Sequence, residues 1–354
     1  MNTIVVKTGR SYQIQIEDGL LLRFPELLAN VYGGRKPALA IITDDTVDAL
    51  YGESLCRQLV HAGYPACKFA FSHGEDSKTL ETVSRVYDFL AANSITRSDV
   101  IIALGGGVVG DLAGFAASSW LRGIDFVQVP TTFLAMIDSS VGGKTGVDIP
   151  QGKNLVGAFW QPSLVVCDPH TLRTLPEETF ADGVAEAIKY GAILDSDLFE
   201  LLERGNLHEH LEAVISRCVD LKREVVEQDE RDKGVRQWLN FGHTLGHAVE
   251  AYSNYTLPHG RGVAIGMVMI CEACEKAGIT PKGTATRIAD CCKRYGLPVS
   301  TDAPLEILCK SCMGDKKRTG SKISLVVLEK IGKAALYPVD AQRLHSFLAG
   351  EISE

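Results

Sequence analysis

The chain has 354 residues, 45% of them hydrophobic and 23% charged, which is the composition of a folded globular protein and excludes general disorder. At roughly 150 residues per domain, this length predicts about two domains. Acidic residues outnumber basic ones by 44 to 36, and the net charge of −8 argues against nucleic acid as the main partner.

The same sequence predicts a cytoplasmic protein without a membrane segment. The longest uninterrupted apolar run, at 263–271, is far shorter than the roughly 20 residues of a membrane-spanning helix. The N-terminus alternates apolar and polar residues, which is typical of a strand and unlike a secretory signal peptide.

The first 175 residues alternate between strand-like and helix-like segments. Short apolar runs predict strands at 38–42, 100–104, 126–129 and 164–166, and helical spacing predicts helices at 80–93 and 108–118. This alternation is typical of a doubly wound, Rossmann-like parallel α/β sheet. We therefore expect residues 1–175 to form an α/β domain.

Residues 176–354 have a mainly helical pattern and predict a second domain. Helices are expected at 176–188, 196–204, 208–228, 236–252, 260–277, 282–295 and 339–349, with strands at 323–328 and 333–337. No long linker separates the halves, so a ligand site in a cleft between two domains is the default expectation.

A glycine-rich turn, GGGVVGD at 105–111, follows a predicted strand and precedes a predicted helix. It fits the G-x-G-x-x-G pattern, in which glycines allow close backbone approach and the helix N-terminus binds a pyrophosphate. A tight turn without a ligand is the alternative interpretation.

A second glycine-rich stretch runs from Asp138 to Gly146 and is followed by Gly152, Lys153 and Asn154. It presents Lys144, Lys153 and Asn154 among glycines, which suits a cradle for phosphate or an oxyanion. Solvated surface lysines are the equally simple alternative.

A third set combines polar residues at helical spacing. Arg236, Asn240, His243 and His247 are four, three and four residues apart, which predicts one face of one helix. His259 begins the next predicted helix, and Glu186 and Lys189 share another helix at i, i+3. Two or three histidines with a glutamate suit a catalytic zinc with an open coordination position.

Cysteine pairs at 271/274 and 309/312 could in principle form a four-thiolate zinc site. The first pair lies in a helical pattern and neither has zinc-knuckle flanks, so we interpret these cysteines as core residues. A basic turn at 315–320 is, in isolation, typical of a solvated surface.

These motifs together resemble the 3-dehydroquinate synthase family of sugar-phosphate cyclases over nearly the whole chain. The segments that carry the resemblance are, in order, GGGVVGDLAGFAAS, QVPTTFLAMIDSSVGGKTGV, GKNLVGAFWQP, GVAEAIKYG, LNFGHTLGHAVEA, HGRGVAIGM and DKK. The resemblance implies a cytoplasmic homodimer with an NAD-binding α/β domain and a mainly helical domain. It also implies a divalent metal, usually Zn²⁺, with Co²⁺ as the alternative.

The resemblance also implies roles for individual residues. It makes Glu186, His243 and His259 the metal ligands, whereas the local pattern alone left His247 open as a ligand. His247 would instead face the substrate phosphate and assist proton transfer. Asp232 stands at the position of one of the family's proposed catalytic acids. The implied NAD contacts are Asp44, Glu75, Lys78, Gly106, Gly107, Val108, Asp111, Thr131, Thr132, Lys153, Thr171, Leu172, Arg173 and Thr174. The implied substrate contacts are Asp138, Lys144, Asn154, Lys189, Lys222, Arg236, Asn240 and Lys316, together with Arg122 from the other subunit.

The implied reaction converts 3-deoxy-D-arabino-heptulosonate 7-phosphate to 3-dehydroquinate and phosphate in the shikimate route to aromatic amino acids. Two positions depart from the family pattern. Arg261 follows the third metal-ligand position where the family usually has Glu, and Asp232 stands where Glu is usual. Neither departure removes a metal ligand.

Three other functions would account for parts of this pattern. A sister cyclase, of the 2-deoxy-scyllo-inosose or 2-epi-5-epi-valiolone synthase type, would share the glycine-rich turn and the metal ligands. A metal-dependent polyol dehydrogenase would not need so many cations at its site and would release NADH. A cysteine-based zinc module that binds a partner would lack the NAD and metal residues.

Overall fold

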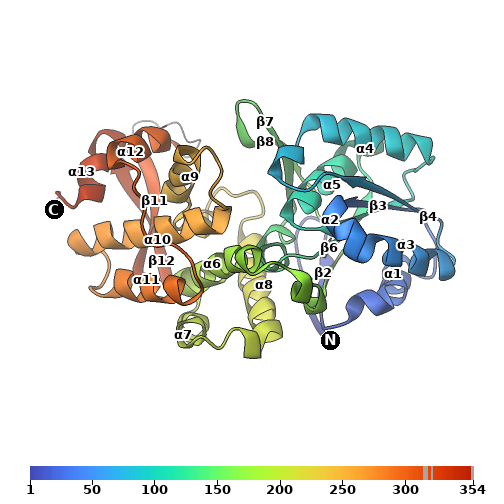
Figure 1. Cartoon of the computed structure of the whole chain (residues 1–354), viewed down its shortest axis with the longest axis horizontal. Helices are drawn as coiled ribbons and strands as arrows, with labels where there is room; N and C mark the ends of the chain where they lie inside the picture. The colour runs from blue at the N-terminus through green and yellow to red at the C-terminus, as the bar shows by residue number, and fades with distance from the viewer. Residues whose placement is uncertain (314–317, 320–321, 352–354) are drawn as a thin grey trace. The chain divides into compact units, whose positions relative to one another are not determined.

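The computed structural model describes residues 1–313, 318–319 and 322–351 (Figure 1). The chain divides into two compact units. Unit 1 contains Met1–Pro176 together with Lys222–Arg231, and unit 2 contains Glu177–Leu221 and Asp232–Glu354. The short returning segment is tied into unit 1, because Lys7 N–H donates to Glu227 at 2.7 Å and Gly9 N–H donates to Glu230 at 3.1 Å.

Unit 1 is built on a seven-stranded sheet in the order β1-β2-β9-β6-β5-β3-β4. The strands are β1 (Asn2–Val6), β2 (Tyr12–Ile16), β3 (Leu39–Asp44), β4 (Ala66–Phe71), β5 (Val100–Gly105), β6 (Asp125–Pro130) and β9 (Leu164–Cys167). The sheet is parallel, as predicted, except at one edge. There β1 pairs with β2 antiparallel, because the two are joined by a short hairpin, whereas the other pairs are parallel.

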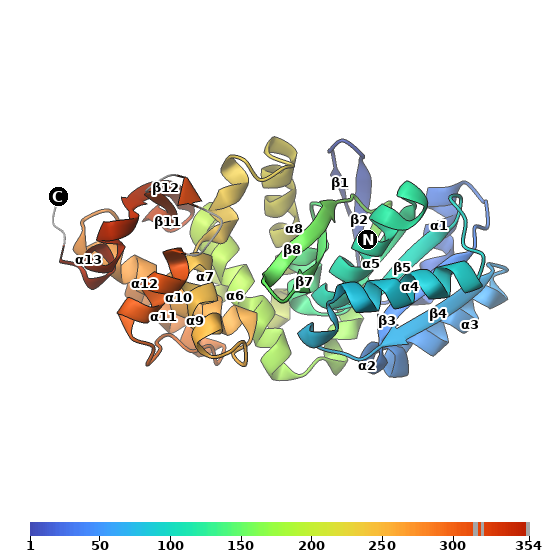
Figure 2. The same ribbon diagram turned by 90° about the horizontal axis from the view of Figure 1, so that it is seen from above.

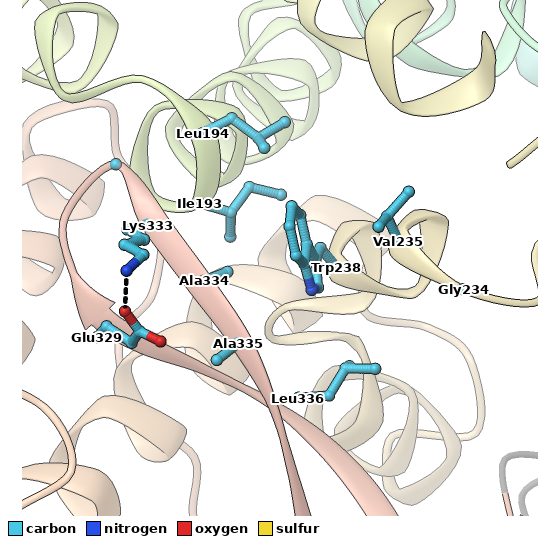
Figure 3. Close-up of a pocket in the computed structure, with 11 residues that line it drawn as sticks. Ile193, Leu194, Gly234, Val235, Trp238, Glu329, Lys333, Ala334, Ala335 and Leu336 are labelled. Carbon is cyan, nitrogen blue, oxygen red and sulfur yellow. Dashed lines mark ion pairs between the residues drawn. The ribbon is translucent and has the colours of Figure 1, made fainter. Parts of the chain in front are cut away.

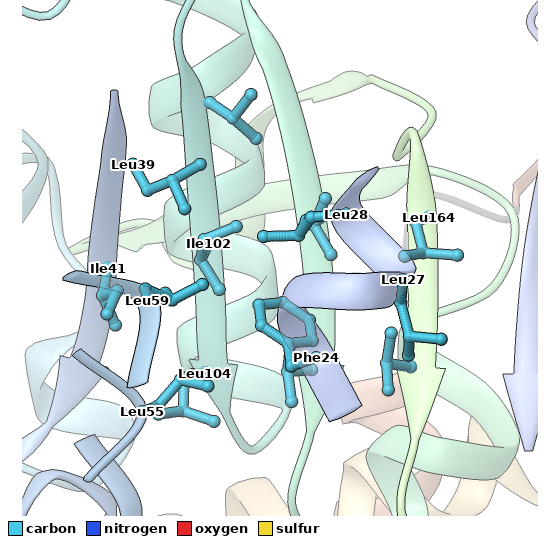
Figure 4. Close-up of a cluster of buried hydrophobic side chains, with 14 of the residues drawn as sticks. Phe24, Leu27, Leu28, Leu39, Ile41, Leu55, Leu59, Ile102, Leu104 and Leu164 are labelled. Atoms are coloured by element: carbon cyan, nitrogen blue, oxygen red, sulfur yellow. The ribbon is translucent and has the colours of Figure 1, made fainter. Parts of the chain in front are cut away.

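Helices cover both faces of this sheet, which confirms the doubly wound α/β architecture. The elements are α1 (Phe24–Tyr32), α2 (Asp45–Val47), α3 (Glu53–His61), α4 (Leu80–Ala92) and α5 (Gly107–Ser119). Phe24, Leu28 and Leu59 of α1 and α3 pack on one face against Ile102 and Leu164 (Figure 4). The residues of α4 and α5 form the core on the other face. Burial on both faces explains why the strands read as continuous apolar runs rather than as alternating ones.

The second glycine-rich stretch, which was expected to cradle phosphate or an oxyanion, forms a β-hairpin. After the short π-helix η5 (Ala135–Ser139), strands β7 (Lys144–Ile149) and β8 (Gly152–Phe159) pair antiparallel. Gly146 and Gly157 face each other, and a Cβ on Gly157 would lie 2.2 Å from the Thr145 carbonyl oxygen. Gly146 and Gly157 therefore allow the two strands to pair closely.

Unit 2 is mainly helical, as predicted. It contains α6 (Glu177–Leu194), α7 (Ser196–Arg204), α8 (Leu211–Gln228, whose last residues belong to unit 1), α9 (His243–Tyr252), α10 (His259–Lys276), α11 (Thr284–Arg294), α12 (Leu305–Met313) and α13 (Leu344–Ala349). A small antiparallel sheet is formed by β10 (Arg318–Thr319), β11 (Lys322–Lys330) and β12 (Lys333–Asp340). The predicted helix at 339–349 begins later than expected, since β12 extends to Asp340.

Glycines bring α9 and α10 into close contact. A Cβ on Gly246 would lie 2.9 Å from the Gly262 carbonyl oxygen, and one on Gly266 would lie 2.0 Å from the Gly242 carbonyl oxygen. A larger residue at these positions would force the two backbones apart. Figure 2 shows α9 beside α10, with α6 packed near α10.

The prediction of one continuous helix over 236–252 is wrong. Residues 235–240 form a separate 3-10 turn, η8 (Val235–Asn240), and α9 starts only at His243. Gly242 has φ +77°, a left-handed conformation that ends the first segment and redirects the chain. Arg236 and Asn240 therefore do not share a helix face with His243 and His247.

No helix among the described residues is both long enough and apolar enough to cross a membrane.

Candidate functional site

In unit 1, the predicted nucleotide residues gather at the carboxyl ends of β3, β5 and β6. Asp44 ends β3, Gly105 ends β5, and Thr131 follows β6 and donates its N–H to the Gly105 carbonyl at 2.9 Å. These parallel strands are neighbours, so their ends lie at one edge of the sheet, where doubly wound proteins bind ligands.

The start of α5 is suited to an anion. Gly106 is the N-cap residue and its helix has no side-chain cap, so the first-turn N–H groups remain available for a ligand. A Cβ on Gly106 would lie 3.0 Å from Thr132 Cγ2, and one on Gly107 would lie 3.2 Å from Ser139 Oγ. The glycines thus keep the backbone accessible at the point where a pyrophosphate would approach.

Lys78 joins residues that the resemblance assigned to NAD and to substrate. Its Nζ lies 2.7 Å from Asp111 Oδ2, 3.8 Å from Glu75 Oε1 and 2.7 Å from Asn154 Oδ1. Burial alone would lower the pKa of Lys78, but Asp111 and Glu75 raise it above its ordinary value, so the ammonium is charged at neutral pH.

Asp148 supports this network and was missed by sequence reasoning. Its carboxylate accepts the Asn154 N–H at 2.7 Å, while its own N–H donates to the Lys78 carbonyl at 2.8 Å. Asn154 has φ +53°, and this backbone bond helps to hold it in the left-handed conformation. The sequence signal was the position of Asp148 near the hairpin turn between Lys144 and Asn154.

A second ion pair holds the segment that precedes β7. Lys222 of α8 donates to the backbone carbonyl of Asp138 at 2.6 Å and to its carboxylate at 2.5 Å, and its side chain is almost fully buried. Gly142 N–H donates to the Tyr12 hydroxyl at 3.0 Å. Lys144 itself is exposed. The structure therefore brings Asp138 and Lys222 together, as two of the predicted substrate residues.

The remaining predicted residues of unit 1 lie outside these two ion pairs, some of them buried and some exposed. Thr171–Thr174 belong to the turn η6 (Pro169–Thr174), where Leu172 is buried and Arg173 pairs with the exposed Asp18 at 3.3 Å. Val108 lies in the first turn of α5, Lys153 lies at the start of β8, and Arg122 is exposed with φ +67°.

In unit 2, Glu186 is the centre of a buried polar cluster. Its side chain is 0% exposed, and its Oε1 lies 3.4 Å from His243 Nε2 and 3.5 Å from His259 Nε2. The other oxygen, Oε2, pairs with the ammonium of Lys189, which is also buried. Burial of a carboxylate costs free energy unless a positive charge lies next to it.

The three predicted ligands fit a metal ion. One ligand atom from each of Glu186, His243 and His259 lies within 4.8 Å of the other two. Two ligand atoms that each lie about 2.0–2.1 Å from a tetrahedral zinc are roughly 3.3 Å apart. The distances from Glu186 Oε1 to the ring nitrogens of His243 and His259, 3.4 and 3.5 Å, are close to this value. Burial alone would lower the pKa of His259, but Glu186 and Glu250 raise it to about 10. The cluster thus attracts positive charge, which a divalent cation also supplies.

The rings of the three histidines converge. The His243, His247 and His259 centroids lie 5.1 to 5.7 Å apart. His247 is exposed, and a second group of potential ligand atoms consists of His247, Glu250 and His259. His247 therefore lies beside the predicted metal ligands.

Glu250 is a residue that sequence reasoning missed. Its Oε1 lies 2.9 Å from His259 Nδ1. A signal was present, because Glu250 follows His243 and His247 at helical spacing, seven and three residues later on α9.

The other predicted residues of unit 2 are placed by the turn η8 and the segment before it. Arg236 is almost fully buried, and Asn240 donates its amide to the Gln237 carbonyl at 3.1 Å. Asp232 has φ +58°. Arg261 lies 3.5 Å from Glu178 Oε1, which gives this departure from the family pattern an acidic neighbour.

Lys316 and the two cysteine pairs remain to be placed. Lys316 lies outside the described residues. Cys271, Cys274, Cys309 and Cys312 are buried, and among the described residues no group of potential metal ligands includes a cysteine. This agrees with their interpretation as core residues.

Unit 2 also contains an apolar pocket of about 560 Å³ that none of the predicted site residues lines (Figure 3). Ile193, Leu194 and Trp238 line it opposite β12, and Glu329 pairs with Lys333 at its edge. Trp238 lies on η8 between Arg236 and Asn240, so the pocket lies beside the turn that carries them.

Comparison with known proteins shows what the chain is similar to. Two family models match consecutive parts of the chain: 3-dehydroquinate synthase N-terminal over residues 68–182 and 3-dehydroquinate synthase C-terminal over residues 183–318. The 3-dehydroquinate synthase of Enterococcus faecalis OG1RF is 44% identical over 357 residues, covering 99% of each chain. That of Clostridium botulinum Alaska E43 is 46% identical over 334 residues, covering 92% of this chain and 95% of the relative.

Solved structures show the same fold in sister cyclases. A 2-deoxy-scyllo-inosose synthase complexed with carbaglucose-6-phosphate, NAD⁺ and Co²⁺ has a TM-score of 0.88 at 25% identity, covering 98% of this chain and 99% of the other. The 2-epi-5-epi-valiolone synthase of Streptomyces hygroscopicus, with NAD⁺ and Zn²⁺ bound, has a TM-score of 0.87 at 27% identity and covers 99% of each.

The sequence comparison decides between these functions, since identity to the dehydroquinate synthases is far higher than to the sister cyclases. The chain is a phosphate-eliminating lyase with 3-dehydroquinate synthase activity. Its two family matches and its full-length relatives place it plainly: the chain belongs to the 3-dehydroquinate synthase family.

Proposed function

We propose that the polar clusters of the two units carry out this reaction with NAD and a divalent metal, preferably Zn²⁺. The substrate is 3-deoxy-D-arabino-heptulosonate 7-phosphate, and the products are 3-dehydroquinate and phosphate. The observation that carries the proposal is the buried cluster of Glu186, His243 and His259 with Lys189. Solved sister cyclases with NAD⁺ and Co²⁺ or Zn²⁺ bound support the choice of cofactors.

When bound, NAD accepts and later returns a hydride, and the metal acts as a Lewis acid toward an oxygen of the substrate. Glu186, His243 and His259 would hold the metal. Asp44, the start of α5, Thr131 and the Lys78 network would hold NAD, with the first-turn N–H groups of α5 on its pyrophosphate.

The basic side chains bind the two anionic groups of the substrate. We assign Lys144, Lys189, Lys222, Lys316 and Arg236 to this role, together with Arg122 of the other subunit. The neutral amides of Asn154 and Asn240 complete the substrate contacts, and Asp138 orients Lys222. Oxidation of a substrate hydroxyl to a ketone makes the proton on the neighbouring carbon more acidic. Loss of that proton then lets phosphate leave by β-elimination. Cations already fixed around the developing negative charge lower the barrier because they need no reorganisation.

His247 is assigned to proton transfer near the phosphate, with Asp232 as a further acid. His247 is exposed beside His243 and His259, so its ring is accessible to a ligand. Imidazole has an ordinary pKa near neutrality, which suits a group that both takes up and gives back a proton.

A substrate panel tests this assignment. Purified protein with NAD and Zn²⁺ would be incubated with 3-deoxy-D-arabino-heptulosonate 7-phosphate, glucose 6-phosphate and sedoheptulose 7-phosphate in separate reactions. We expect phosphate release and a carbocyclic product from the first alone. Turnover of either of the others in preference to the first would assign the chain to a sister cyclase activity. The homodimer and the cytoplasmic location that the family resemblance implies stay predictions.

A further inference from the structure

We propose that Glu250 is a positioning residue for the metal site, fixing the ring of His259 through its Nδ1 atom. This inference rests on the metal assignment in the proposed function. Glu250 Oε1 lies 2.9 Å from His259 Nδ1, and the opposite ring nitrogen, Nε2, lies 3.5 Å from Glu186 Oε1. One carboxylate thus faces each nitrogen of the same imidazole.

This arrangement selects one tautomer. With the proton on Nδ1 and directed at Glu250, the lone pair of Nε2 is directed toward Glu186 and is free to bind a cation. Histidine ligands in metal sites commonly donate their second N–H to a carboxylate, which fixes the ring and makes the ligand more basic.

The backbone holds Glu250 in place. Glu250 is 3% exposed and lies on α9, while His259 is the first residue of α10. A Cβ on Gly262 would lie 3.0 Å from Glu250 Cγ and 3.2 Å from its Oε1. Because α9 and α10 approach closely at Gly246 and Gly262, the Glu250 carboxylate is enclosed against the first turn of α10, which begins with His259.

The two histidine ligands are supported differently. His243 Nδ1 lies 3.1 Å from the backbone carbonyl of Phe241, a neutral acceptor, whereas His259 meets a charged one. The His259 side chain is also the more exposed of the two, at 36% against 12% for His243. Packing restrains His259 less, so an orienting carboxylate matters more there.

Metal affinity measured on the purified protein tests the proposal independently of turnover. Apo protein would be titrated with Zn²⁺ against a chromophoric chelator for the parent and the variants Glu250→Ala and Glu250→Gln. We expect a loss of affinity of about 10- to 100-fold in Glu250→Ala. Glu250→Gln keeps an acceptor oxygen but loses the charge, so it should restore part of the loss.

Two further variants act as controls. Glu275→Gln alters a glutamate of α10 that accepts the Ala285 N–H at 2.6 Å, and it should bind Zn²⁺ as the parent does. Glu186→Ala removes a proposed ligand and should lose more affinity than either change at Glu250. Absorption spectra of the Co²⁺-loaded proteins should shift in the Glu250 variants and stay unchanged in Glu275→Gln.

The outcomes are distinct. If Glu186→Ala loses zinc affinity while Glu250→Gln and Glu250→Ala match the parent in affinity and Co²⁺ spectrum, the positioning role is overturned and the metal site stands. If Glu186→Ala binds zinc as the parent does, the metal site of the proposed function fails, and the role of Glu250 fails with it. Should Glu250→Ala not fold, the Glu250→Gln affinity and spectrum decide.

Discussion

Lys78 Nζ lies 2.7 Å from the side-chain oxygen of Asn154, although the two residues are 76 positions apart in the chain. The family resemblance assigns Lys78 to NAD and Asn154 to the substrate. The contact joins the two sets within unit 1, and Asp148 reinforces it through the backbone of both residues. We therefore expect the binding of NAD and the binding of substrate to depend on each other through this contact.

Lys78→Ala should weaken NAD binding and also raise KM for the sugar phosphate, because Asn154 loses its donor. A hydrogen bond to a charged group contributes about 1.5–3 kcal/mol, which corresponds to a loss of roughly 10- to 100-fold. NAD binding by calorimetry and steady-state kinetics would measure the two effects. Lys68→Ala, which removes a lysine paired with Asp48 at 2.7 Å on β4, should change neither. A normal KM for the sugar phosphate in Lys78→Ala would contradict the coupling.

His259→Ala should abolish turnover and lower the zinc content of the purified protein, because it removes one of three ligands. Zinc would be measured by mass spectrometry on protein purified without added metal. His73→Ala is a matched control, since His73 is exposed and pairs with Asp45 in unit 1. A His259→Ala protein with the zinc content of the parent would rule out this ligand assignment.

Lys144→Ala should weaken substrate binding and spare NAD. Lys144 is exposed at the start of β7, so its loss leaves the hairpin pairing in place. We expect an increase in KM for the sugar phosphate of about tenfold, the effect of losing one charged hydrogen bond. Direct titration with NAD should give the parent affinity, and a matching loss of NAD affinity would place Lys144 in the nucleotide site instead.

Asp195→Ala should destabilise unit 2 at neutral pH. The Asp195 carboxylate caps α7 by accepting the N–H groups of Asp197 and Leu198, and it pairs with Arg217. Loss of such a cap costs about 1 kcal/mol. The free energy of unfolding would be measured by urea titration.

The destabilisation caused by Asp195→Ala should depend on pH. Burial alone would raise the pKa of Asp195, but Arg217 and the capped N–H groups lower it below its ordinary value. A carboxylate with a lowered folded-state pKa stabilises the protein above its unfolded pKa of about 3.9, and this contribution is lost as the pH falls through the folded pKa. The difference between parent and Asp195→Ala should therefore be constant from pH 7 to 5 and shrink below about pH 4. A stability difference between parent and variant that grows as the pH falls would contradict this prediction.

The fold could be predicted largely from periodicity, and the exceptions have physical causes. Apolar runs such as 100–104 identify buried strands because both faces of the sheet are covered. The β7–β8 hairpin was missed because its glycines, including Gly146 and Gly157, serve backbone pairing and carry little apolar pattern. The break before α9 was missed because the left-handed backbone at Gly242 leaves the i, i+4 spacing of the polar residues unchanged.

The candidate site was predicted in part from local spacing and in part from the family resemblance. The helix spacing placed Glu186 beside Lys189, but nothing in a linear pattern shows that Glu186 meets His243 and His259, since tertiary packing of α6, α9 and α10 brings them together. Glu250 and Asp148 were missed for a related reason. Each acts through a contact with another side chain or backbone, which a motif does not display.

The most direct test of the central claim follows phosphate and NADH together. Purified protein with NAD and 3-deoxy-D-arabino-heptulosonate 7-phosphate would be assayed for phosphate release while absorbance reports NADH, before and after chelation and with Zn²⁺ added back. We predict phosphate release that stops on chelation, returns with Zn²⁺ and proceeds without NADH accumulation, because NAD is regenerated in each cycle. Stoichiometric NADH formation without phosphate release would contradict the account and indicate a polyol dehydrogenase.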